Sequence, residues 1–197
     1  MSALTVDHLS ADGREWDGLV RIWEGTDAPE GCKVEIIEGI VTVSPPPSNV
    51  HNDIADLVHR SLYAVITKDR GVYQTLGTAV PSRGGLFIPD IAVVPKAALR
   101  RDPHGYVPAS AVELAVEITS RSNAHNDRLK KAVGYAQAGV PLYLLIDGWA
   151  PGGPTITLYG EPQGDVYRTL HAGKFGDPVG LAEPFGLTLD TSEFPEP

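Results

Sequence analysis

The sequence predicts a mixed α/β domain in which a sheet is covered by helices on both faces. Three patterns support this fold class. Segments that alternate apolar and polar residues recur along the chain and are typical of strands. An apolar stripe at helical spacing runs through residues 49–68. A fully apolar strand, residues 142–146, follows a second helix, and such strands are typical of sheets buried on both sides. The length fits a single domain, residues 1–197.

The N-terminal part, residues 1–31, is predicted to form a helical extension. Four of its apolar residues share one helical face: Trp16, Leu19, Val20 and Trp23. Asp12 stands where it could cap this helix. The next segment, KVEIIEGIVTV at residues 33–43, alternates on both sides of the pair Glu38-Gly39, which is a turn signal. We therefore expect a short antiparallel hairpin after the helical extension.

The clearest helix is predicted to begin at Ser48 or Asn49, after a proline run, and to end near Lys68. Three strand candidates follow it, separated by Gly, Pro and charged residues: 72–80, 86–94 and 111–119. The basic segment between the last two, residues 95–110, is predicted to be a loop.

A second helix is predicted from about Asn123 to Gln137. Its core-facing stripe is formed by Leu129, Ala132, Val133 and Ala136. The apolar strand comes next, and residues 154–197 then alternate again as a C-terminal β extension. In this extension we expect a hairpin around EPQG, residues 161–164, and a last strand near residues 186–190.

The composition excludes several classes of protein. The net charge of −9 argues against indiscriminate coating of nucleic acid, although residues 83–131 hold eight Lys or Arg against five Asp or Glu. The single cysteine, Cys32, excludes an intrachain disulfide and is typical of a reducing compartment. The first residues lack a signal-peptide pattern, and no apolar run approaches the roughly 20 residues that span a bilayer. We expect a cytoplasmic protein with no membrane partner.

Two acidic residues stand inside predicted strands. Asp90 shares a strand face with Ala92, and Glu117 shares one with Ala115. A small neighbour leaves room above the sheet, and a buried carboxylate needs a partner because an isolated charge is very costly to bury. Two carboxylates from adjacent strands suit a hard cation such as Mg²⁺, which activates water and stabilises negative charge on a scissile phosphate.

A lysine on the second helix could reach this pair of carboxylates. Arg128, Lys131 and Tyr135 flank the core stripe of that helix, so the long side chain of Lys131 can extend along the helix toward the acids. The pattern therefore predicts two acids and one ammonium group around a cation, which is a layout for phosphodiester cleavage.

These residues resemble a known pattern. Asp90 follows Pro89, and Glu117 lies on the next strand, as in the PD-(D/E)XK nucleases. The flanking segments are similar to the Uma-type restriction-endonuclease family of bacteria. The similarity runs through VEIIEGIVTVSPPPSNVHNDI, FIPDIAVV, AVELAVEITSRS and NDRLKKAVGYAQAGVPLYLLID, and it returns in the terminal GLTLD. It covers about residues 33–147 and the tail.

The resemblance implies a restriction-endonuclease-like αβββαβ core at residues 33–147, with a mixed sheet flanked by helices. It implies a metal-dependent endonuclease that hydrolyses DNA phosphodiester bonds. It further implies that Asp90, Glu117 and Glu35 hold Mg²⁺, for which Mn²⁺ can substitute, and that Lys131 is catalytic together with the first two acids. The residues expected to line the site are His51, Thr119 and Tyr135.

The chain also departs from the wider pattern. The usual motif has a lysine two residues after the glutamate, where this chain has Thr119. The Uma-type proteins share this change and carry the lysine on the following helix, four residues before a tyrosine, which selects Lys131 before Tyr135. Arg121 interrupts the Ser-Pro-Ser that often follows the glutamate, and Leu142 stands where the family often has an acid.

Plainer interpretations exist for each residue. Asp90 could cap the turn after the preceding proline. Glu117 could pair with Arg121 at a strand end. Lys131 could form an ordinary solvated pair with Asp127 on its own helix. In the same way, the acid of the first hairpin could be solvated and the histidine of the first long helix could bond locally.

Two further questions concern function and assembly. The alternative function is a catalytically silent module of the same fold that binds nucleic acid or protein. DNA is the expected partner, and a homodimer is a candidate assembly because many nucleases of this fold cut both strands as dimers. A hydrolase built on His51 and Asp53 lacks a nucleophile in any recognisable turn, so we set that class aside.

Overall fold

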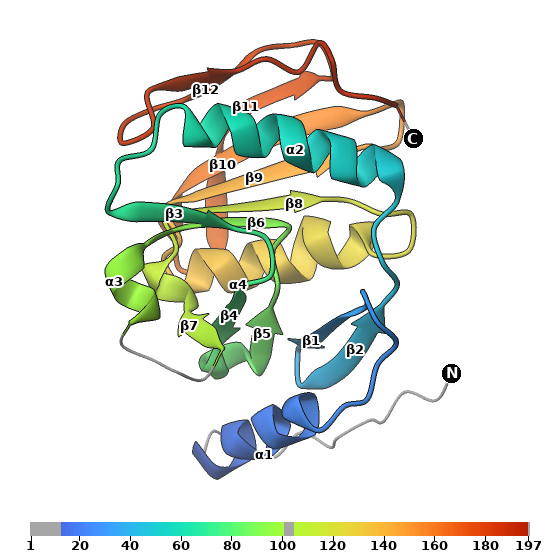
Figure 1. The fold of residues 1–197 in the computed structure, drawn as a ribbon, viewed down its shortest axis with the longest axis vertical. Helices are drawn as coiled ribbons and strands as arrows, with labels where there is room; N and C mark the ends of the chain where they lie inside the picture. Colours follow the sequence, from blue (N-terminus) through green and yellow to red (C-terminus); the bar gives the residue numbers. More distant parts are fainter. Residues whose placement is uncertain (1–12, 101–104, 197) are drawn as a thin grey trace.

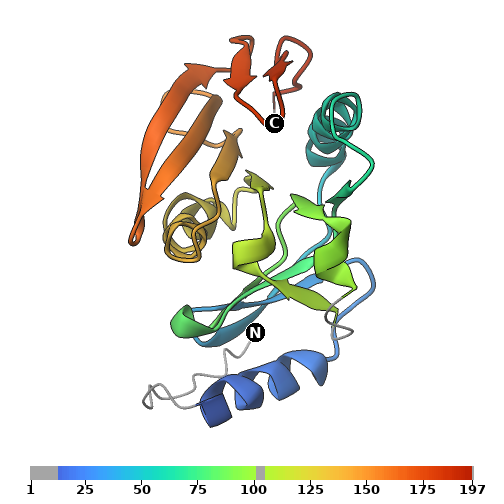
Figure 2. The same ribbon diagram turned by 90° about the vertical axis from the view of Figure 1, so that its left-hand side faces the viewer.

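The computed structural model describes residues 13–100 and 105–196, and its elements stack in layers (Figure 1). Helix α2 and a small two-stranded sheet cover one face of a six-stranded sheet. Helix α4 lies on the other face, between this sheet and a five-stranded sheet. Helix α1 packs on the far side of the five-stranded sheet, which Figure 2 shows from the side. None of the described helices combines the length and the apolar character needed to cross a membrane.

The N-terminal predictions for the described residues are confirmed. Helix α1 (Gly13–Glu24) packs its apolar stripe against the sheet that contains β1 (Lys33–Ile37) and β2 (Ile40–Ser44). These two strands form an antiparallel hairpin whose turn residues have φ of 51° at Glu38 and 77° at Gly39. Positive φ at both central residues is the conformation of the tightest hairpin turns. The proposed cap of α1, Asp12, lies outside the described residues.

Helix α2 (Asn49–Tyr63) begins at the predicted position. The hydroxyl of the cap residue Ser48 accepts a hydrogen bond from the backbone N–H of His51 at 3.2 Å. The helix buries its apolar stripe on the six-stranded sheet. It ends at Tyr63, a few residues before the predicted end near Lys68.

Two of the three predicted strands after α2 are wrong as single strands, because each breaks and changes sheet. The segment 72–80 becomes β3 (Arg70–Tyr73) in the six-stranded sheet and β4 (Gly77–Val80) in the five-stranded sheet. The segment 86–94 becomes β5 (Gly85–Phe87) and β6 (Ile91–Pro95) in the same two sheets, in reverse order.

The break between β5 and β6 decides where Asp90 lies. Pro89 has no N–H to donate to a neighbouring strand, so the ladder stops there. Asp90 therefore stands in the crossover between the two sheets, directly before β6, and not inside a strand as predicted.

The remaining strands complete a mixed architecture. The six-stranded sheet has the order β11-β10-β9-β8-β6-β3, and β8 and β9 are parallel while the other pairs are antiparallel. The five-stranded sheet has the order β2-β1-β5-β4-β7. The strands not yet introduced are β7 (Tyr106–Pro108), β8 (Leu114–Ile118), β9 (Leu142–Asp147), β10 (Thr155–Gln163), β11 (Val166–Lys174), β12 (Val179–Leu181) and β13 (Leu187–Leu189).

The predicted basic loop contains short regular elements in its described part. They are α3 (Lys96–Leu99), β7 and the 3₁₀ turn η2 (Ala109–Ala111), and a further 3₁₀ turn, η1 (Pro81–Arg83), links β4 to β5. The C-terminal hairpin of β10 and β11 and the last strand, β13, form as predicted.

The second helix forms, and Ala132 and Ala136 of the predicted stripe face the core, but Leu129 does not. It consists of a π-helical segment, η3 (Asn126–Lys131), continued by α4 (Ala132–Gln137). Leu129, predicted to face the core, is 56% exposed, whereas Asp127 and Lys131 are each 3% exposed. The wider π segment changes which side chains face inward, and oppositely charged partners from other elements make the burial of these two groups tolerable.

Helix α4 approaches the five-stranded sheet closely. At Gly134, an added Cβ would lie 2.5 Å from the ring of Phe87, so glycine is required for this packing distance. The ring of Phe87 in turn meets that of Tyr135 edge to face, at 5.3 Å between centroids.

Candidate active site

A cavity of about 240 Å³ opens where β1, the N-terminal end of α2, the C-terminal end of β8 and η3 meet. Eight acidic or basic side chains line it: Lys33, Glu35, His51, Asp90, Glu117, Arg121, Asp127 and Lys131. Five of these side chains are almost completely buried, and they come from four chain segments far apart in the sequence: Glu35, Asp90, Glu117, Asp127 and Lys131.

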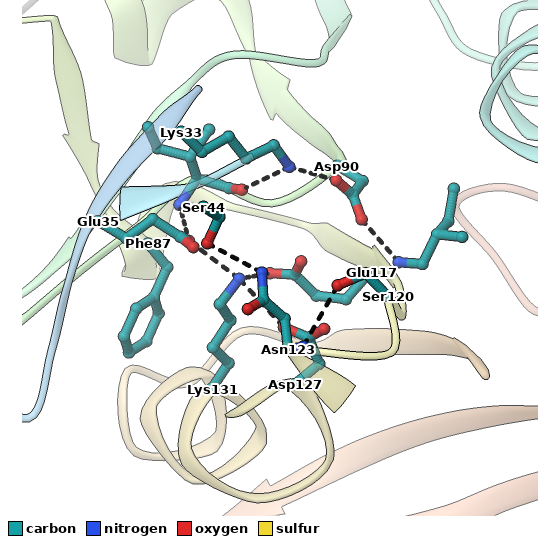
Figure 3. A network of polar contacts seen from close by, with 12 residues as sticks. Lys33, Glu35, Ser44, Phe87, Asp90, Glu117, Ser120, Asn123, Asp127 and Lys131 are labelled. Carbon is teal, nitrogen blue, oxygen red and sulfur yellow. Dashed lines mark hydrogen bonds and ion pairs between the residues drawn. The ribbon is translucent and has the colours of Figure 1, made fainter. Parts of the chain in front are cut away.

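The ammonium group of Lys131 lies at the centre of three carboxylates (Figure 3). Its Nζ is 2.9 Å from Glu35 Oε1, 3.2 Å from Glu117 Oε1 and 3.2 Å from Asp127 Oδ1. The ordinary helix pair with Asp127 therefore exists, but it is buried and is only one of three contacts. The long stem of the lysine extends from η3 toward the end of β8, as predicted.

Neighbouring elements fix the carboxylates that face Lys131. Glu35 on β1 also accepts a hydrogen bond from the backbone N–H of Ile88 at 2.7 Å, in the crossover that precedes Asp90. Glu117 on β8 accepts a hydrogen bond from the Tyr135 hydroxyl at 3.0 Å. The alternative pairing of Glu117 with Arg121 is not observed.

Asp90 has three donors of its own. Its Oδ2 accepts the backbone N–H of Ile118 at 2.7 Å and lies 3.0 Å from Nε2 of His51, and its Oδ1 forms a hydrogen-bonded ion pair with Lys33. The contact with Ile118 holds the crossover beside the end of β8, so Asp90 and Glu117 face the same cavity. The predicted turn cap after Pro89 is thus replaced by contacts to other elements.

The pKa values show how the cluster distributes its charge. Burial raises the pKa of Asp90, but His51 and Lys33 more than offset it, so the pKa lies below its usual range and Asp90 is ionised. Burial raises the pKa of Glu117 well above its usual range; Lys131 opposes this shift, and the neighbouring acids Asp127, Asp90 and Glu35 add to it. Asp90 thus loses its proton at a much lower pH than Glu117 does.

The other groups around the lysine respond to the same balance. Burial raises the pKa of Asp127 to about 6, against the attraction of Lys131. Burial lowers the pKa of Lys131, but the carboxylates of Glu117, Glu35 and Asp127 outweigh it, and the resulting pKa is well above the usual range. Lys131 therefore keeps its proton and acts as a fixed positive charge.

Thr119 lines the cavity but makes its contact elsewhere. Its hydroxyl donates to Asp147 Oδ1 at 2.9 Å, at the end of β9. Asp147 also accepts two hydrogen bonds from Arg128, at 2.6 and 2.9 Å. The position that holds a lysine in the usual motif therefore ties β8 to β9 and to the second helix.

The structure brings six of the predicted residues to the lining of one cavity; Tyr135 does not line it but lies behind it, bonded to Glu117, and the structure adds two residues that were not predicted. Lys33 precedes Glu35 by two residues on β1 and so shares its strand face, a signal that the sequence contains. Asp127 was considered only as a solvated partner of Lys131, because its burial depends on acids and bases distant in the sequence.

The charges of the cluster are unequal. Four carboxylates, from Glu35, Asp90, Glu117 and Asp127, face two ammonium groups, from Lys33 and Lys131. If all are ionised, an excess of two negative charges remains in a largely buried site. A divalent cation or bound protons could compensate it, since buried charges need partners. Within the described residues, no three His, Cys, Asp or Glu side chains are already placed to hold one ion.

Comparisons with known proteins agree with this fold. The chain is similar to a solved structure from Anabaena variabilis, titled a "putative nuclease belonging to DUF820". The TM-score is 0.67 and the sequence identity is 19%, over 89% of this chain and 96% of that chain. The fold is thus restriction-endonuclease-like, a mixed α and β architecture with sheets flanked by helices, as predicted.

The family follows from the sequence itself. The Uma2 family model, described as "Putative restriction endonuclease", matches residues 19–192, and the chain belongs to this family. The prediction from the sequence motifs is confirmed at this level. No curated protein matches the chain.

Proposed function

We propose that this protein is a divalent-cation-dependent endonuclease that hydrolyses phosphodiester bonds in DNA. The observation that carries the proposal is a group of four buried carboxylates, three of them around Lys131 and the fourth, Asp90, beside them, in a cavity of a nuclease-family fold. Oxygen donors with this charge suit Mg²⁺, or Mn²⁺ in its place.

The donor set fits such a cation by charge and by atom type. Asp90 and Glu117, with Glu35 beside them, are the residues that would hold it. When bound, the cation would lower the pKa of a water molecule and stabilise charge on the scissile phosphate. Binding would also displace the proton that the raised pKa of Glu117 favours, because a cation and a proton compete for the same oxygen.

The residues around the acids have separate tasks. Lys131 stays protonated, so it can stabilise a phosphate oxygen or orient the attacking water, but it cannot serve as a general base. Tyr135 donates to Glu117 and fixes the direction of its carboxylate. His51 and the backbone N–H of Ile118 do the same for Asp90.

The test is nicking of supercoiled plasmid DNA with Mg²⁺ or Mn²⁺. We expect the native chain to nick and Asp90→Ala to lose the activity while its circular dichroism spectrum is unchanged. Asp56→Ala is the matched control, because Asp56 is an exposed acid that pairs with Arg60 on α2, away from the cavity. Absence of cutting of any duplex or single strand, or equal cutting by Asp90→Ala, would refute the proposal.

A second function is favoured by one specific observation. Both oxygens of Asp90 already have donors, namely Lys33, His51 and the Ile118 N–H, which is the arrangement of a closed salt-bridge network. A nuclease-fold module that binds DNA without cutting it would have this geometry. Titration calorimetry separates the two functions: no heat with Mg²⁺, together with DNA association that weakens with salt, would favour the binding module.

A further inference from the structure

Trp149 stands at the edge of the site, in the turn after β9, and lines the cavity. It is 40% exposed. Tryptophan has the largest apolar side chain, and an indole left at the rim of a charged cavity presents a flat apolar surface to whatever enters. The proposed hydrolysis assigns it no task.

The backbone of Trp149 is held on both sides. Its N–H donates to Asp147 Oδ1 at 3.1 Å, and its carbonyl oxygen accepts from Arg128 at 2.7 Å. Arg128 and Asp147 are themselves a close ion pair, with Nε and Oδ2 2.6 Å apart. The indole therefore projects from a fixed point and not from a loose loop.

The same network connects Trp149 to the acids of the site. Asp147 accepts the hydroxyl of Thr119, which follows Glu117 by two residues. The end of β8 carries both the carboxylate and the anchor of the turn. The backbone of Trp149 is thereby connected, through Asp147 and Thr119, to the end of the strand that carries Glu117.

A positive charge accompanies the indole. The guanidinium carbon of Arg121 lies 5.8 Å from the centroid of the Trp149 ring, and Arg121 also lines the cavity and is exposed. Among the described residues, no carboxylate pairs with this guanidinium. An exposed indole together with a guanidinium that has no carboxylate partner among the described residues matches a nucleotide, which offers a base to stack and a phosphate to pair.

We propose that Trp149 and Arg121 form a stacking platform for an unpaired base, and that the site therefore prefers single-stranded DNA or unpaired segments over intact duplex. This inference rests on the proposed function for its substrate, DNA. In a duplex each base is stacked between its neighbours and shows only its edges in the grooves, so the indole has no ring face to contact. In a single strand the ring faces are free, and the guanidinium can turn to the adjoining phosphate.

The test measures binding without cutting. A short labelled single strand and the matching blunt duplex are titrated by fluorescence anisotropy in EDTA. We expect the single strand to bind at least about tenfold more tightly than the duplex, and Trp149→Ala to weaken its binding about tenfold or more. Trp149→Phe keeps an aromatic ring and should retain most of the affinity. Arg121→Gln should weaken binding and reduce its salt dependence by about one phosphate contact.

Matched controls lie outside the cavity lining. Tyr63→Ala removes an aromatic ring that is 54% exposed, and Arg60→Gln removes an exposed guanidinium, both on α2. Neither should change strand binding. Circular dichroism establishes that each variant is folded. If Trp149→Ala fails to fold, tryptophan fluorescence provides the test in its place. The single strand should quench the emission of the native protein more than it quenches the emission of Trp149→Phe.

Three results would overturn the platform: equal or tighter binding of the duplex, unchanged affinity of folded Trp149→Ala, or equal quenching of native protein and Trp149→Phe. Failure of the proposed hydrolysis would give a different set of results. A chain that cuts no DNA with Mg²⁺ but binds single strands through Trp149 loses the nuclease function and keeps the platform. A chain that nicks plasmid while Trp149→Ala binds normally keeps the function and loses the platform.

Discussion

The two faces of the six-stranded sheet share the same strands but have opposite interiors. On the α2 face, Val116 and Ile118 of β8 belong to a wholly apolar cluster. On the α4 face, Ala115 and Glu117 of the same strand lead from an apolar cluster into the charged group around Lys131. Alternate residues of one strand thus serve stability on one side and the candidate chemistry on the other.

The difference has an energetic side. The apolar face gains free energy from every group that it buries, about 25 cal/mol per Å² of apolar surface. The other face buries carboxylates, and burial raises the pKa values of Glu117 and Asp127. A raised pKa means that folding makes the ionised form of the carboxylate less favourable than it is in the unfolded chain. The free energy of unfolding should therefore fall when a buried apolar side chain is truncated, and it should not fall when a buried carboxylate is neutralised.

The largest expected effect sharpens this comparison on the charged face. Glu117→Gln keeps the size of the side chain and an oxygen that can accept from Tyr135, but it removes the charge. We expect nicking to fall by about 100- to 1,000-fold. The melting temperature should not fall, because the raised pKa of Glu117 means that burial already favours an uncharged group at this position.

Plasmid nicking and thermal denaturation of the same preparation check this prediction. Glu161→Gln, an exposed acid on β10, is the control for the chemistry of the substitution. Full activity in Glu117→Gln, or a large loss of melting temperature, would contradict the division of tasks between the faces.

The next effect tests the apolar face. Leu144 is 1% exposed and lies in the cluster beneath α2. Leu144→Ala should lower the free energy of unfolding by about 2–5 kcal/mol through lost burial and a cavity. Nicking per folded molecule should be unchanged, because Leu144 does not line the site.

Urea denaturation measures this loss, with Leu170→Ala as the control. Leu170 is 42% exposed on β11, so its truncation should change the free energy of unfolding by less than about 0.5 kcal/mol. Similar losses in the two variants would show that the apolar face is not the main source of stability.

A third, smaller effect is a gain of stability that depends on pH. The pKa of Asp127 rises from 3.8 to about 6 on folding, so the folded chain binds more protons than the unfolded chain between these values. The free energy of unfolding therefore falls as pH rises through this window. Asp127→Asn should remove this penalty and gain up to about 3 kcal/mol above pH 6.

Unfolding curves at several pH values check the sign of this prediction. The gain should shrink as the pH is lowered and vanish near the ordinary pKa of aspartate, 3.8, where both states are protonated. A variant that is less stable than the native chain at neutral pH would show that the attraction between Asp127 and Lys131 outweighs the cost of burial.

The smallest effect concerns an ion pair at the edge of the charged group. Arg128→Gln removes the ion pair with Asp147, whose pKa is lowered because Arg128 and Thr119 more than offset the effect of burial. We expect a loss of about 1 kcal/mol. A lowered carboxylate pKa contributes stability above the unfolded value and loses it in acid, so the difference should disappear at low pH. An equal loss at all pH values would assign the effect to packing.

Local signals in the sequence predicted much of this fold. The pair Glu38-Gly39 defines the first hairpin, and Ser48 caps α2, because turn and cap chemistry depend on neighbouring residues only. The crossing of chain segments between two sheets was missed. The proline that ends one ladder is visible in the sequence, but the sheet that receives the next strand is decided by packing.

The candidate site was likewise predicted in part from local signals and missed in part. Asp90, Glu117 and Lys131 were identified from their order and spacing, and they meet in one cavity. The inward face of the second helix was predicted wrongly at Leu129, which fits an ideal α-helical stripe, because a π segment carries this part of the helix. Asp127 was predicted to be a solvated partner of Lys131, because helical spacing alone cannot tell which side of a helix meets charged residues from distant strands.

Glu117 and Lys131 are held in place by different kinds of packing. Glu117 is tied into a ladder of backbone hydrogen bonds, while Lys131 belongs to a helix whose distance from the five-stranded sheet depends on one missing methyl group, at Gly134. The separation of the two groups can therefore change without any rebuilding of the sheet. A larger side chain at residue 134 would therefore displace Lys131 together with Asp127, which belongs to the same helix, while Glu35 and Glu117 keep their places in the strands.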